Sequence, residues 1–591
     1  MVKQKKAFLR NRYPLAKSLN LNPPQAILPH MRTLLTTLHS KYIHASLALP
    51  CLAAFCAEDC GELLIREYTV HEPKESLLAQ IVDCDADVVA FSVYLWNRLA
   101  TLELVVCLKL VNPELKIVLG GPEISFEDDD FFARHPVDAL ICGEGELPLR
   151  QLLRAWQVGA EPQPFSGLRT KLQPQPNGQS LLENLDQLPS PFAAGLVDLT
   201  RGLVYYESSR GCPYDCSFCM SALDEQVRSF SQERIFTDLK LLMDRQVKQI
   251  KFVDRTFNYH NQRSREIFRF ILQHNRSSHF HFEIGAHLLD AETLQLLETV
   301  PEGMFQFEIG VQSTLPETLA KVGRSASLAK LAENVHRLRS FGNIHLHLDL
   351  IAGLPGESFS QFLTSLDWTA ALQPHHLQIE PVKVLPGAPL REQSAALGLR
   401  FDPNPPYAIL HSTDLDYAEL ERLRGIGRLL DLLVNSGRFK FLLPALTAHF
   451  SSLSATLDSL DRYWRSADLY RGTRSLRELY WIVDGYLKQV FSGQKLTRMR
   501  ELLGRDFAHN ERVVGGSAPD FFDVNLNAEE AEQVRRQVKQ VTAEEPRSGK
   551  VQYFAALYHH LEDLPGRRVV IFLYLTRSAQ GLEVRELLLE E

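Results

Sequence analysis

Three segments in the middle of the chain alternate strictly between apolar and polar residues. They read "HFHFEIGAH" at 279–287, "FQFEIGVQS" at 305–313 and "HLHLDLIAG" at 345–353. Because successive side chains of a strand point to opposite faces, each segment predicts a strand with one apolar and one polar face. An open parallel sheet covered by helices on both sides is apolar on both faces. The pattern therefore favours a barrel or partial barrel with helices packed on its apolar outside.

The polar faces of these strands would line the lumen of the barrel. An ordinary barrel of this kind fills its lumen mainly with Val, Ile and Leu, so a polar lining indicates a cavity that holds a ligand. A layer of mutually satisfied polar groups is the alternative. A substrate bound there would present polar groups, because buried polar side chains need partners. The residues expected in the lumen are His281, Glu283, Glu308, His345 and His347.

The chain before the barrel alternates short apolar runs with helical stretches, which predicts a doubly wound parallel sheet. The runs lie at 33–38, 63–70, 87–94, 116–122 and 138–146. Ligands of such sheets bind at the carboxyl ends of the strands. Glycines there would let a large flat or anionic ligand approach the backbone, although tight turns use glycine too; they are Gly120, Gly121, Gly143 and Gly145. None of them forms the G-x-G-x-x-G that opens a helix, so a nicotinamide cofactor is not expected.

Shifts in composition divide the chain into segments. We expect a tail at 1–30, the doubly wound domain at 31–157, a linker rich in Pro, Gln and Gly at 158–200, the barrel domain at 201–409 and a mainly helical domain at 410–591. The tail carries six Lys and Arg residues and no acid, so it is either a basic tail or a misassigned leader, with translation starting at Met1 or Met31. The last domain ends in two predicted strands joined by a Gly-containing turn and carries no motif with a known chemistry.

Charge and hydropathy bear on the compartment and on the partners. A net charge of -8 and a pI near 6.2 give no general attraction to nucleic acid or to an anionic membrane. The sequence has no apolar run of the roughly 18 to 20 residues that a membrane span needs, and no secretory signal. A cytoplasmic, reducing compartment is expected, where cysteines are thiols or ligands more often than disulfides.

Three cysteines lie close together in "RGCPYDCSFC", at Cys212, Cys216 and Cys219. Gly211 and Pro213 argue for a loop that follows a strand. Zinc would need a fourth Cys or His ligand, usually from a second spaced pair. The only candidate for that ligand is His260, which is far from the three cysteines in the sequence. A [4Fe–4S] cluster normally takes four thiolates. Three thiolates would therefore leave one iron open to a ligand that is not part of the protein.

The stretch "CPYDCSFC", with Phe218 directly before the third cysteine, resembles the signature of the radical S-adenosylmethionine (radical SAM) superfamily. The resemblance implies that the open iron binds SAM, and that an electron from the reduced cluster breaks a carbon–sulfur bond to give a 5′-deoxyadenosyl radical. The elements "SVYLWN", "GGPE" and "GEGE" before the barrel resemble the cobalamin-binding subclass. The whole layout is similar to B12-binding radical SAM proteins whose last domain has no assigned function.

The fold class that follows is α/β. A Rossmann-like doubly wound cobalamin-binding domain precedes a partial (β/α) TIM-like radical SAM barrel and a mainly helical C-terminal domain. The resemblance also implies roles for single residues. It makes Cys212, Cys216 and Cys219 the cluster ligands, with Phe218 beside the cofactor, and it places Asp254 at the SAM amino group, although the family's Gly-Gly-Glu sequence is absent.

Further roles follow from the same resemblance. The ribose and adenine of SAM would contact Glu308, Gln312, Ile351 and Gly353. Cobalamin would contact Ser92, Gly120, Gly121, Gly143 and Gly145, with Tyr94 in place of the Leu of the family's Ser-x-Leu element. The candidate catalytic residues are Asp254, Glu308 and His347.

Two other groups of residues have a less specific pattern. The loop "TLHSKYIHASLAL" contains His39 and His44 but lacks the Asp-x-His-x-x-Gly motif that supplies an axial ligand to cobalt, so cobalamin is expected to bind without a protein His. Cys51, Cys56 and Cys60 could belong to a second cluster, as in methylthiotransferases. Their spacing also fits an amphipathic helix, in which buried Cys behaves as a small hydrophobic residue.

The function that these expectations describe is a cobalamin-dependent radical SAM enzyme. For this pairing of domains the family implies methyl transfer from SAM through cobalamin to an unactivated carbon or phosphorus. A non-methylating radical rearrangement or cyclisation, and a cobalamin or redox sensor without turnover, are the alternatives. The expected partners are a small-molecule or peptide substrate and an electron donor such as flavodoxin or ferredoxin, with neither a membrane nor a nucleic acid.

Overall fold

The computed structural model describes residues 31–41, 43–175, 177–223, 226–472, 474–544, 552–561, 566–577 and 581–589. The tail predicted at 1–30 lies outside the described residues. The chain divides into two compact units. The first consists of Met1–Ile309, Ala320–His345 and Lys383–Leu410, and the second of Gly310–Leu319, Leu346–Val382 and His411–Glu591. The boundaries predicted from composition are linear along the chain, whereas these units are assembled from separate segments.

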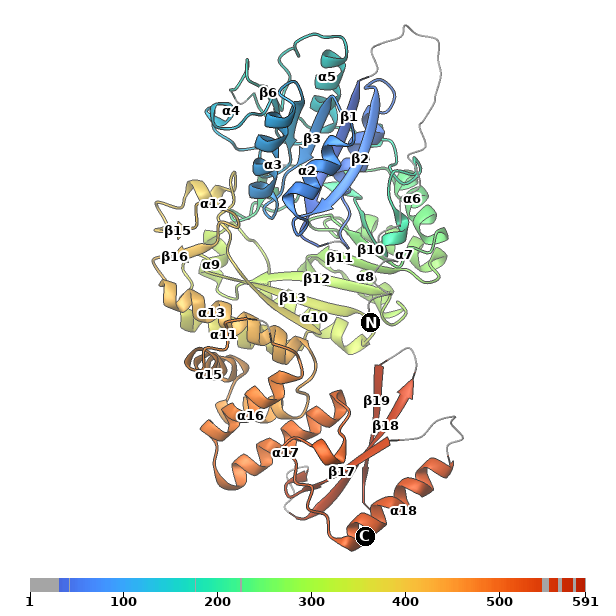
Figure 1. Cartoon of the computed structure of the whole chain (residues 1–591), viewed down its shortest axis with the longest axis vertical. Coiled ribbons are helices and arrows are strands. Elements are labelled where there is room, and N and C mark those ends of the chain that lie inside the picture. Colours follow the sequence, from blue (N-terminus) through green and yellow to red (C-terminus); the bar gives the residue numbers. More distant parts are fainter. Residues whose placement is uncertain are drawn as a thin grey trace. The chain divides into compact units, whose positions relative to one another are not determined.

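The first sheet, drawn in blue in Figure 1, has the strand order β2-β1-β3-β4-β5-β6. Its strands are β1 (Arg32–His39), β2 (Glu62–Thr69), β3 (Val88–Ser92), β4 (Lys116–Gly120), β5 (Ala139–Ile141) and β6 (Leu168–Thr170). Strands β1 to β5 are parallel, and β6 pairs antiparallel with β5. The helices between them are α1 (Ala48–Cys56), α2 (Lys74–Val82), α3 (Arg98–Val111), α4 (Phe131–Arg134) and α5 (Glu146–Gln157). The predicted doubly wound sheet is confirmed, and its strand order reverses at β1 and β3, where such sheets bind ligands.

The second sheet has the order β14-β13-β12-β11-β10-β7. Its strands are β7 (Leu203–Tyr206), β10 (Gln249–Phe252), β11 (His279–Ile284), β12 (Phe305–Gln312), β13 (His345–Ala352) and β14 (His376–Pro381). The pairs β7–β10, β10–β11, β11–β12 and β13–β14 are parallel. The connecting helices are α6 (Gln232–Asp244), α7 (Asn261–His274), α8 (Ala291–Glu298), α9 (Pro316–Lys321), α10 (Leu328–Phe341) and α11 (Phe359–Ala371). This six-stranded sheet is the predicted partial barrel.

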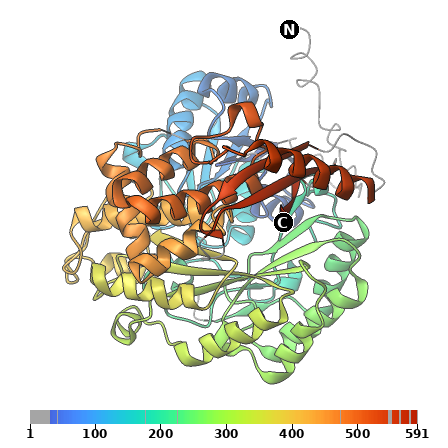
Figure 2. The same cartoon turned by 90° about the horizontal axis from the view of Figure 1, so that it is seen from below.

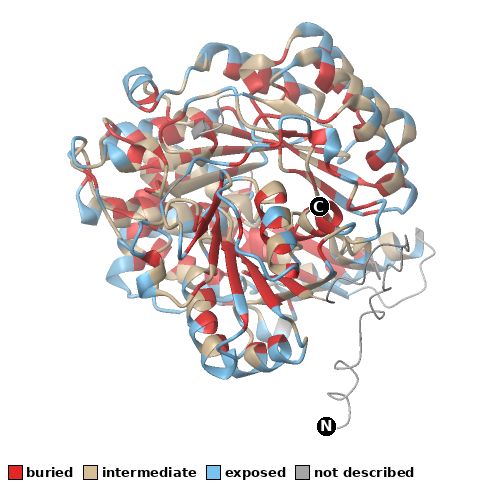
Figure 3. Cartoon of the chain, turned by 90° about the horizontal axis from the view of Figure 1, so that it is seen from above, coloured by how far each residue is buried: buried red, intermediate tan, exposed pale blue. Residues whose placement is uncertain are grey.

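The alternation read from the sequence is present in β11, β12 and β13. Along each strand buried apolar residues alternate with exposed or half-buried residues, which are polar or Gly apart from Ile351 of β13. Figure 3 shows buried residues on the strands of the sheets and many exposed residues on the helices around them. In the first unit an aromatic core packs behind β10 and β11, where the rings of Phe252 and Phe282 lie 4.6 Å apart and those of Phe257 and Phe282 also 4.6 Å apart. The helices therefore pack on the apolar side of the sheet.

Several helices begin where the sequence offers a capping residue. Ser231 accepts a hydrogen bond from the backbone of Arg234 at the start of α6, and Asp290 accepts one from Thr293 at the start of α8. Ser358 with Gln361 forms a capping box at α11. Such caps satisfy backbone N–H groups that have no partner within the helix.

The remaining elements follow the barrel. Short ones are α12 (Pro389–Glu392), β15 (Arg400–Phe401) and β16 (Ile409–His411). The C-terminal helices are α13 (Tyr417–Leu429), α14 (Leu442–Phe450), α15 (Leu453–Ser466), α16 (Glu478–Val490), α17 (Gly493–Asn510) and α18 (Ala528–Glu544), with a π-helical segment at Leu430–Asn435. None of the helices in the described part of the chain is long and apolar enough to cross a membrane.

The chain ends in an antiparallel sheet, drawn in red in Figure 2. Its strands are β17 (Gln552–Tyr558), β18 (Arg568–Arg577) and β19 (Gly581–Leu588), in that order. The sequence predicted β18 and β19, and it missed β17. Val534 and Val538 of α18 pack against Leu557, Ile571 and Leu573 of this sheet.

The free edge of β14 is covered by the C-terminal helices within the second unit. Asn435 uses its side-chain amide as a strand would use its backbone: Oδ1 accepts from Leu377 N at 3.0 Å, and Nδ2 donates to Leu377 O at 2.8 Å. On α13, a Cβ atom at Gly427 would lie 3.4 Å from Ile379. The edge of the barrel is therefore protected by the C-terminal region, for which the sequence predicted no function.

Candidate functional site

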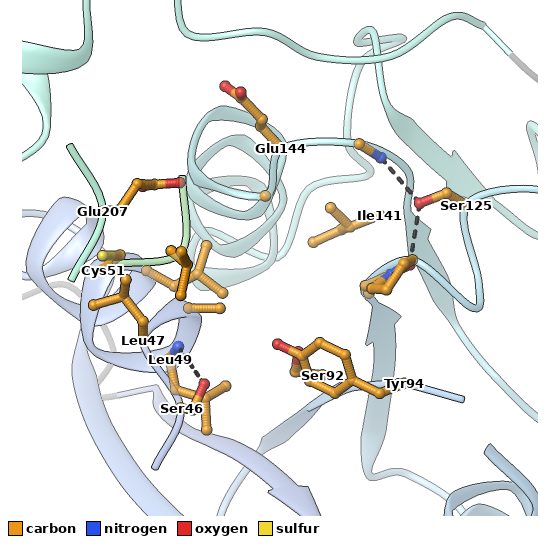
Figure 4. A pocket seen from close by; sticks show the side chains of 18 of the residues that line it. Ser46, Leu47, Leu49, Cys51, Ser92, Tyr94, Ser125, Ile141, Glu144 and Glu207 are labelled. Carbon is orange, nitrogen blue, oxygen red and sulfur yellow. Dashed lines mark hydrogen bonds between the residues drawn. The ribbon is translucent and has the colours of Figure 1, made fainter. Parts of the chain in front are cut away.

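A cavity of about 770 Å³ lies within the first unit, at the carboxyl ends of β1, β3, β4 and β5 (Figure 4). All the residues predicted to contact cobalamin line it: Ser92, Gly120, Gly121, Gly143 and Gly145. On the other side it is lined by Tyr205, Glu207, Ser209, Arg210 and Gly211, which lead into the cysteine-bearing loop. The cavity thus joins the two regions to which the sequence assigned cofactors, whereas the individual contacts with cobalamin remain predictions.

Glycine is required by the geometry of this cavity at two positions. Gly121 has φ +103°, and a Cβ atom there would lie 2.5 Å from the carbonyl oxygen of Val93. Gly143 has φ +81° and donates its N–H to Ser125 Oγ at 3.1 Å, while Ser125 Oγ donates to Gly121 O at 3.1 Å (Figure 4). Ser125 therefore ties the two glycine turns together, a role that nothing in its sequence context signals. The bare backbone leaves room that suits a broad, flat ligand.

Aromatic residues line the same cavity near β1 and β3. Tyr94 stacks on Trp96, with centroids 4.7 Å apart and planes 6° apart. Trp96 Nε1 donates to Leu38 O at 2.9 Å, which fixes the indole ring. The sequence identified Tyr94 only as a departure from the family's Leu, and it marked Trp96 only as a member of the element "SVYLWN".

The two histidines of the first loop also line the cavity, and each has a partner. His39 Nε2 lies 3.4 Å from the Glu67 carboxylate. His44 Nδ1 lies 2.7 Å from the hydroxyl of Tyr205. Burial, and next the neighbouring positive charges, lower the pKa of His44, so its imidazole is neutral near pH 7. The prediction that neither histidine is an axial ligand of cobalt is not tested by these contacts.

The predicted cluster ligands lie on the loop between β8 (Ser209–Arg210) and β9 (Arg228–Ser229). Cys219 N donates to Cys216 O at 2.9 Å, and Ser221 N donates to the Cys219 sulfur at 3.4 Å. Cys212 Sγ lies 3.6 Å from Thr256 Oγ1, and Arg324 Nη1 lies 3.7 Å from Cys216 Sγ. All three cysteines are free thiols. A donor set of three thiols on one loop fits an iron–sulfur cluster with one open iron.

Among the described residues, no group of three or more His, Cys, Asp or Glu side chains has the geometry to hold a single metal ion. The thiolates of a [4Fe–4S] cluster bind different iron atoms, so they need not converge on one point. Cys51, Cys56 and Cys60 are buried on and after α1, and Cys60 Sγ lies 3.8 Å from the carbonyl of Arg150. Their burial supports the amphipathic-helix interpretation over a second cluster.

Asp254 lies just beyond β10 and is buried. Ser208 donates to it twice, from its N–H at 3.0 Å and from its hydroxyl at 2.6 Å, and the Ser209 hydroxyl donates to it as well. Arg263 lies 3.7 Å away. The carboxylate therefore holds the segment between β7 and β8, and a contact with the SAM amino group stays a prediction.

The other predicted SAM contacts lie on β12, on β13 and just after β13. In the first unit, Glu308 lies 2.9 Å from His281 Nε2 and 3.4 Å from Lys251 Nζ. In the second unit, His347 lies 3.0 Å from Asp349. Gln312 closes β12 with φ +70°, while Ile351 lies near the end of β13 and Gly353 follows it. These polar groups form mutual contacts, so each unit contributes partly satisfied polar clusters at the barrel strands.

Known protein families match most of the chain. Residues 34–153 match the B12 binding domain, residues 206–369 the radical SAM superfamily, and residues 395–559 a region described as a protein of unknown function, DUF4080. The chain is 29% identical over 371 residues to the 2-(S-pantetheinyl)-carbapenam-3-carboxylate methyltransferase of Streptantibioticus cattleyicolor, covering 57% of this chain and 53% of that protein. It is 28% identical over 371 residues to the cobalamin-dependent radical SAM methyltransferase TokK of Streptomyces tokunonensis, with the same coverage.

The chain thus spans about half the length of these curated relatives. Among solved structures, the cobalamin-dependent S-adenosylmethionine radical enzyme OxsB has the same fold, with a TM-score of 0.57 and 14% identity over 88% of this chain and 82% of that one. A region that matches the B12 binding domain therefore precedes a region that matches the radical SAM superfamily, which is the order of domains in B12-binding radical SAM proteins. The region that follows them matches DUF4080.

Proposed function

We propose that the protein is a cobalamin-dependent radical SAM methyltransferase. The observation that carries the proposal is the cavity, because it is shared by the glycine turns of the B12 binding domain and by the segment that leads into the three cysteines. When bound, a cluster on Cys212, Cys216 and Cys219 would supply the electron that cleaves SAM, and cobalamin would carry the methyl group. The cavity at the glycine turns would hold the cobalamin.

The chain's own residues would orient and shield these groups. Thr256 and Arg324 contact the sulfurs of Cys212 and Cys216, so they would orient two of the three thiolates. Asp254 holds the segment before the cysteine loop through Ser208. The polar groups of β11 to β13 would bind a polar substrate, a small molecule or a peptide, whose methylated atom would be an unactivated carbon or phosphorus. An electron donor such as flavodoxin or ferredoxin would reduce the cluster.

A radical rearrangement without methyl transfer is the second candidate. It is favoured by the structural likeness that covers most of the chain, which is to an enzyme named only as a cobalamin-dependent radical enzyme. A methylated product would decide between the two reactions.

The test is anaerobic purification with iron and cobalamin, followed by measurement of cluster content and of SAM cleavage under strong reduction. We expect a [4Fe–4S] cluster, bound cobalamin and SAM cleavage in the natural protein. Cys216→Ala should lose both the cluster and the cleavage, since two thiolates do not retain it. The matched control is Cys107→Ala on α3, which removes a thiol far from the loop in sequence and should change neither. Full SAM cleavage by Cys216→Ala would refute the assignment.

A further inference from the structure

The loop that carries the three cysteines is closed at its base by a short ribbon. Strands β8 and β9 pair antiparallel, with Ser209 opposite Ser229 and Arg210 opposite Arg228. Gly211, the first residue of the loop, has φ +92°, and a Cβ atom there would collide with the carbonyl oxygen of Gln226. The two ends of the loop, residues 211–227, are therefore fixed to each other. Directly opposite residues of such a pair project to the same face.

Both arginines of this ribbon bind the same carboxylate, that of Glu144. Arg228 donates from Nη2 to Oε1 at 2.6 Å and from Nη1 to Oε2 at 3.2 Å. Arg210 Nη1 lies 3.2 Å from Oε2. Leu182 N also donates to Oε2, at 2.7 Å. Glu144 is therefore held by both ends of the cysteine loop and by one backbone amide.

Glu144 also belongs to the loop that forms the cavity. It lies between Gly143 and Gly145, and all three residues line the cavity. Arg210 makes two more ion pairs, with Glu146 at 2.7 Å and with Glu207 at 3.0 Å. Glu146 is the first residue of α5, and Glu207 directly follows β7. The arginine next to the cysteine loop thus joins the B12 binding domain to the first barrel strand.

The contacts of Glu144 are those of a charged group. Its side chain is 15% exposed, and those of Arg210 and Arg228 are 13% and 14% exposed. Burial by itself raises the pKa of Glu144, but the hydrogen bonds from Arg228, the charge of Arg210 and the Leu182 amide lower it below its ordinary value. Ion pairs with several hydrogen bonds and little exposure fix geometry more strictly than pairs on the surface.

We propose that Glu144 is a positioning residue that fixes the cysteine loop, and with it the cluster, at a set distance from the cobalamin cavity. The proposal rests on the proposed function, because it assumes that both cofactors bind. It does not make Glu144 a ligand of either cofactor. Both ends of the loop converge on one side chain, so a single change there should loosen the loop while leaving the three thiols and the glycine turns intact. Arg210 would still pair with Glu146 and Glu207, and Arg228 would still donate to Leu182 O.

The decisive variant is Glu144→Gln, which keeps the shape of the side chain and an acceptor for Leu182 N but removes the charge that binds both arginines. The protein is loaded with the cluster and with Co(II) cobalamin, and pulsed electron paramagnetic resonance measures the distance between the cobalt and the reduced cluster. The natural protein should give one narrow distance. Glu144→Gln should give a broader distribution extending to longer distances, compared with the natural protein at equal iron and cobalamin occupancy.

The matched control is Asp59→Asn, which removes a charge from an ion pair of similar length within the same domain. Asp59 pairs with Arg150 at 2.8 Å and with Arg154 at 3.5 Å, both on α5. This variant should keep the narrow distance of the natural protein. A distribution in Glu144→Gln equal to that of the natural protein overturns the proposal. If Glu144→Gln fails to fold, Arg228→Gln is measured in the same way, since it removes one of the two arginines and leaves Arg210 in place.

Failure of the proposed function would appear differently, as a natural protein that binds no cluster or no cobalamin. In that case hydrogen exchange of the purified chain tests the hold on the loop without cofactors. Peptides that cover residues 211–227 should exchange faster in Glu144→Gln than in Asp59→Asn and in the natural protein. Equal exchange in all three proteins would show that Glu144 does not hold the cysteine loop.

Discussion

The carboxyl group of Glu357 is fully buried just before α11. Its Oε1 accepts hydrogen bonds from Ser313 Oγ at 2.9 Å and from Ser365 Oγ at 2.7 Å. Burial raises its pKa from the ordinary 4.5 to about 7, although both hydroxyls lower it. The residue gave no signal in the sequence beyond its place after "GLPG", because its burial depends on segments that meet only in the folded chain.

A pH dependence of stability follows from this pKa. A carboxyl whose pKa is raised on folding stabilises the folded state fully below pH 4.5, and that contribution is lost as the pH rises through about 7. Glu357→Gln has no proton to lose. The free energy of unfolding of the natural protein, relative to that of Glu357→Gln, should therefore fall by roughly 3 kcal/mol between pH 5 and pH 8. Denaturant unfolding at several pH values measures it, and a constant difference would contradict the buried, raised carboxyl.

A spectroscopic prediction concerns the histidines of the cavity. His39 lies beside Glu67 and His44 beside the Tyr205 hydroxyl, so each imidazole has a partner in the protein. With no Asp-x-His-x-x-Gly motif, we expect cobalamin to bind without a protein nitrogen on cobalt. The Co(II) form should then show no nitrogen superhyperfine splitting from an imidazole. A splitting that disappears in His39→Ala or in His44→Ala would show that the loop does supply the ligand.

The sequence led to many of the residues around the cavity but not to the contacts that hold them. The five residues assigned to cobalamin do line one cavity, because glycine and serine at the ends of parallel strands mark such sites directly. The roles of Ser125 and of Trp96, which the sequence marked only as part of "SVYLWN", were not foreseen, since they depend on segments that pair only in three dimensions. The same holds for Glu144, whose partners Arg210 and Arg228 are more than sixty residues away along the chain.

Among the elements, the strands with strict alternation were the most predictable. In β11 and β12 the apolar and buried residues recur at every second position, and in β13 the burial keeps this period even where Leu350, Ile351 and Ala352 are all apolar. Strand β17 was missed because "QYFAALY" is nearly continuous in its apolar residues and follows a long helical pattern. The π-helical segment at Leu430–Asn435 was not foreseen either, because its sequence continues that of α13 without a break.

That segment makes a testable contribution to the barrel. Asn435 satisfies both the N–H and the C=O of Leu377 at the edge of β14. Asn435→Ala leaves two backbone groups without this partner, and each such loss costs about 1–3 kcal/mol when the group is buried. We expect a loss of about 2 kcal/mol in the free energy of unfolding, since the site is only partly buried. Thr364→Ala, on the exposed side of α11, is the control and should change stability by at most about 0.5 kcal/mol. Equal stability of the two variants would show that the amide does not protect the edge.

The order of the domains along the chain could be predicted, but the way the chain divides into units could not. The matches to the B12 binding domain and the radical SAM superfamily confirm the first two parts of that order. The first unit also takes in Lys383–Leu410, a segment that follows all six barrel strands in the sequence. There Tyr407 donates from its hydroxyl to Glu123 at 2.8 Å, and Gly387 packs on the ring of Phe126. Contacts between residues so far apart leave no periodic trace in a single sequence.

The membership of Lys383–Leu410 in the first unit has a consequence for synthesis on the ribosome. Domains generally fold as units, beginning with the N-terminal one while the chain is still being made. Here the sheet of β1 to β6 can form early, but Glu123 obtains the Tyr407 hydroxyl only after residue 407 has left the exit tunnel. In the growing chain the first unit therefore obtains this contact only after the barrel strands have been translated. A pause in translation beyond residue 410 would let the first unit complete its folding before the C-terminal helices leave the ribosome.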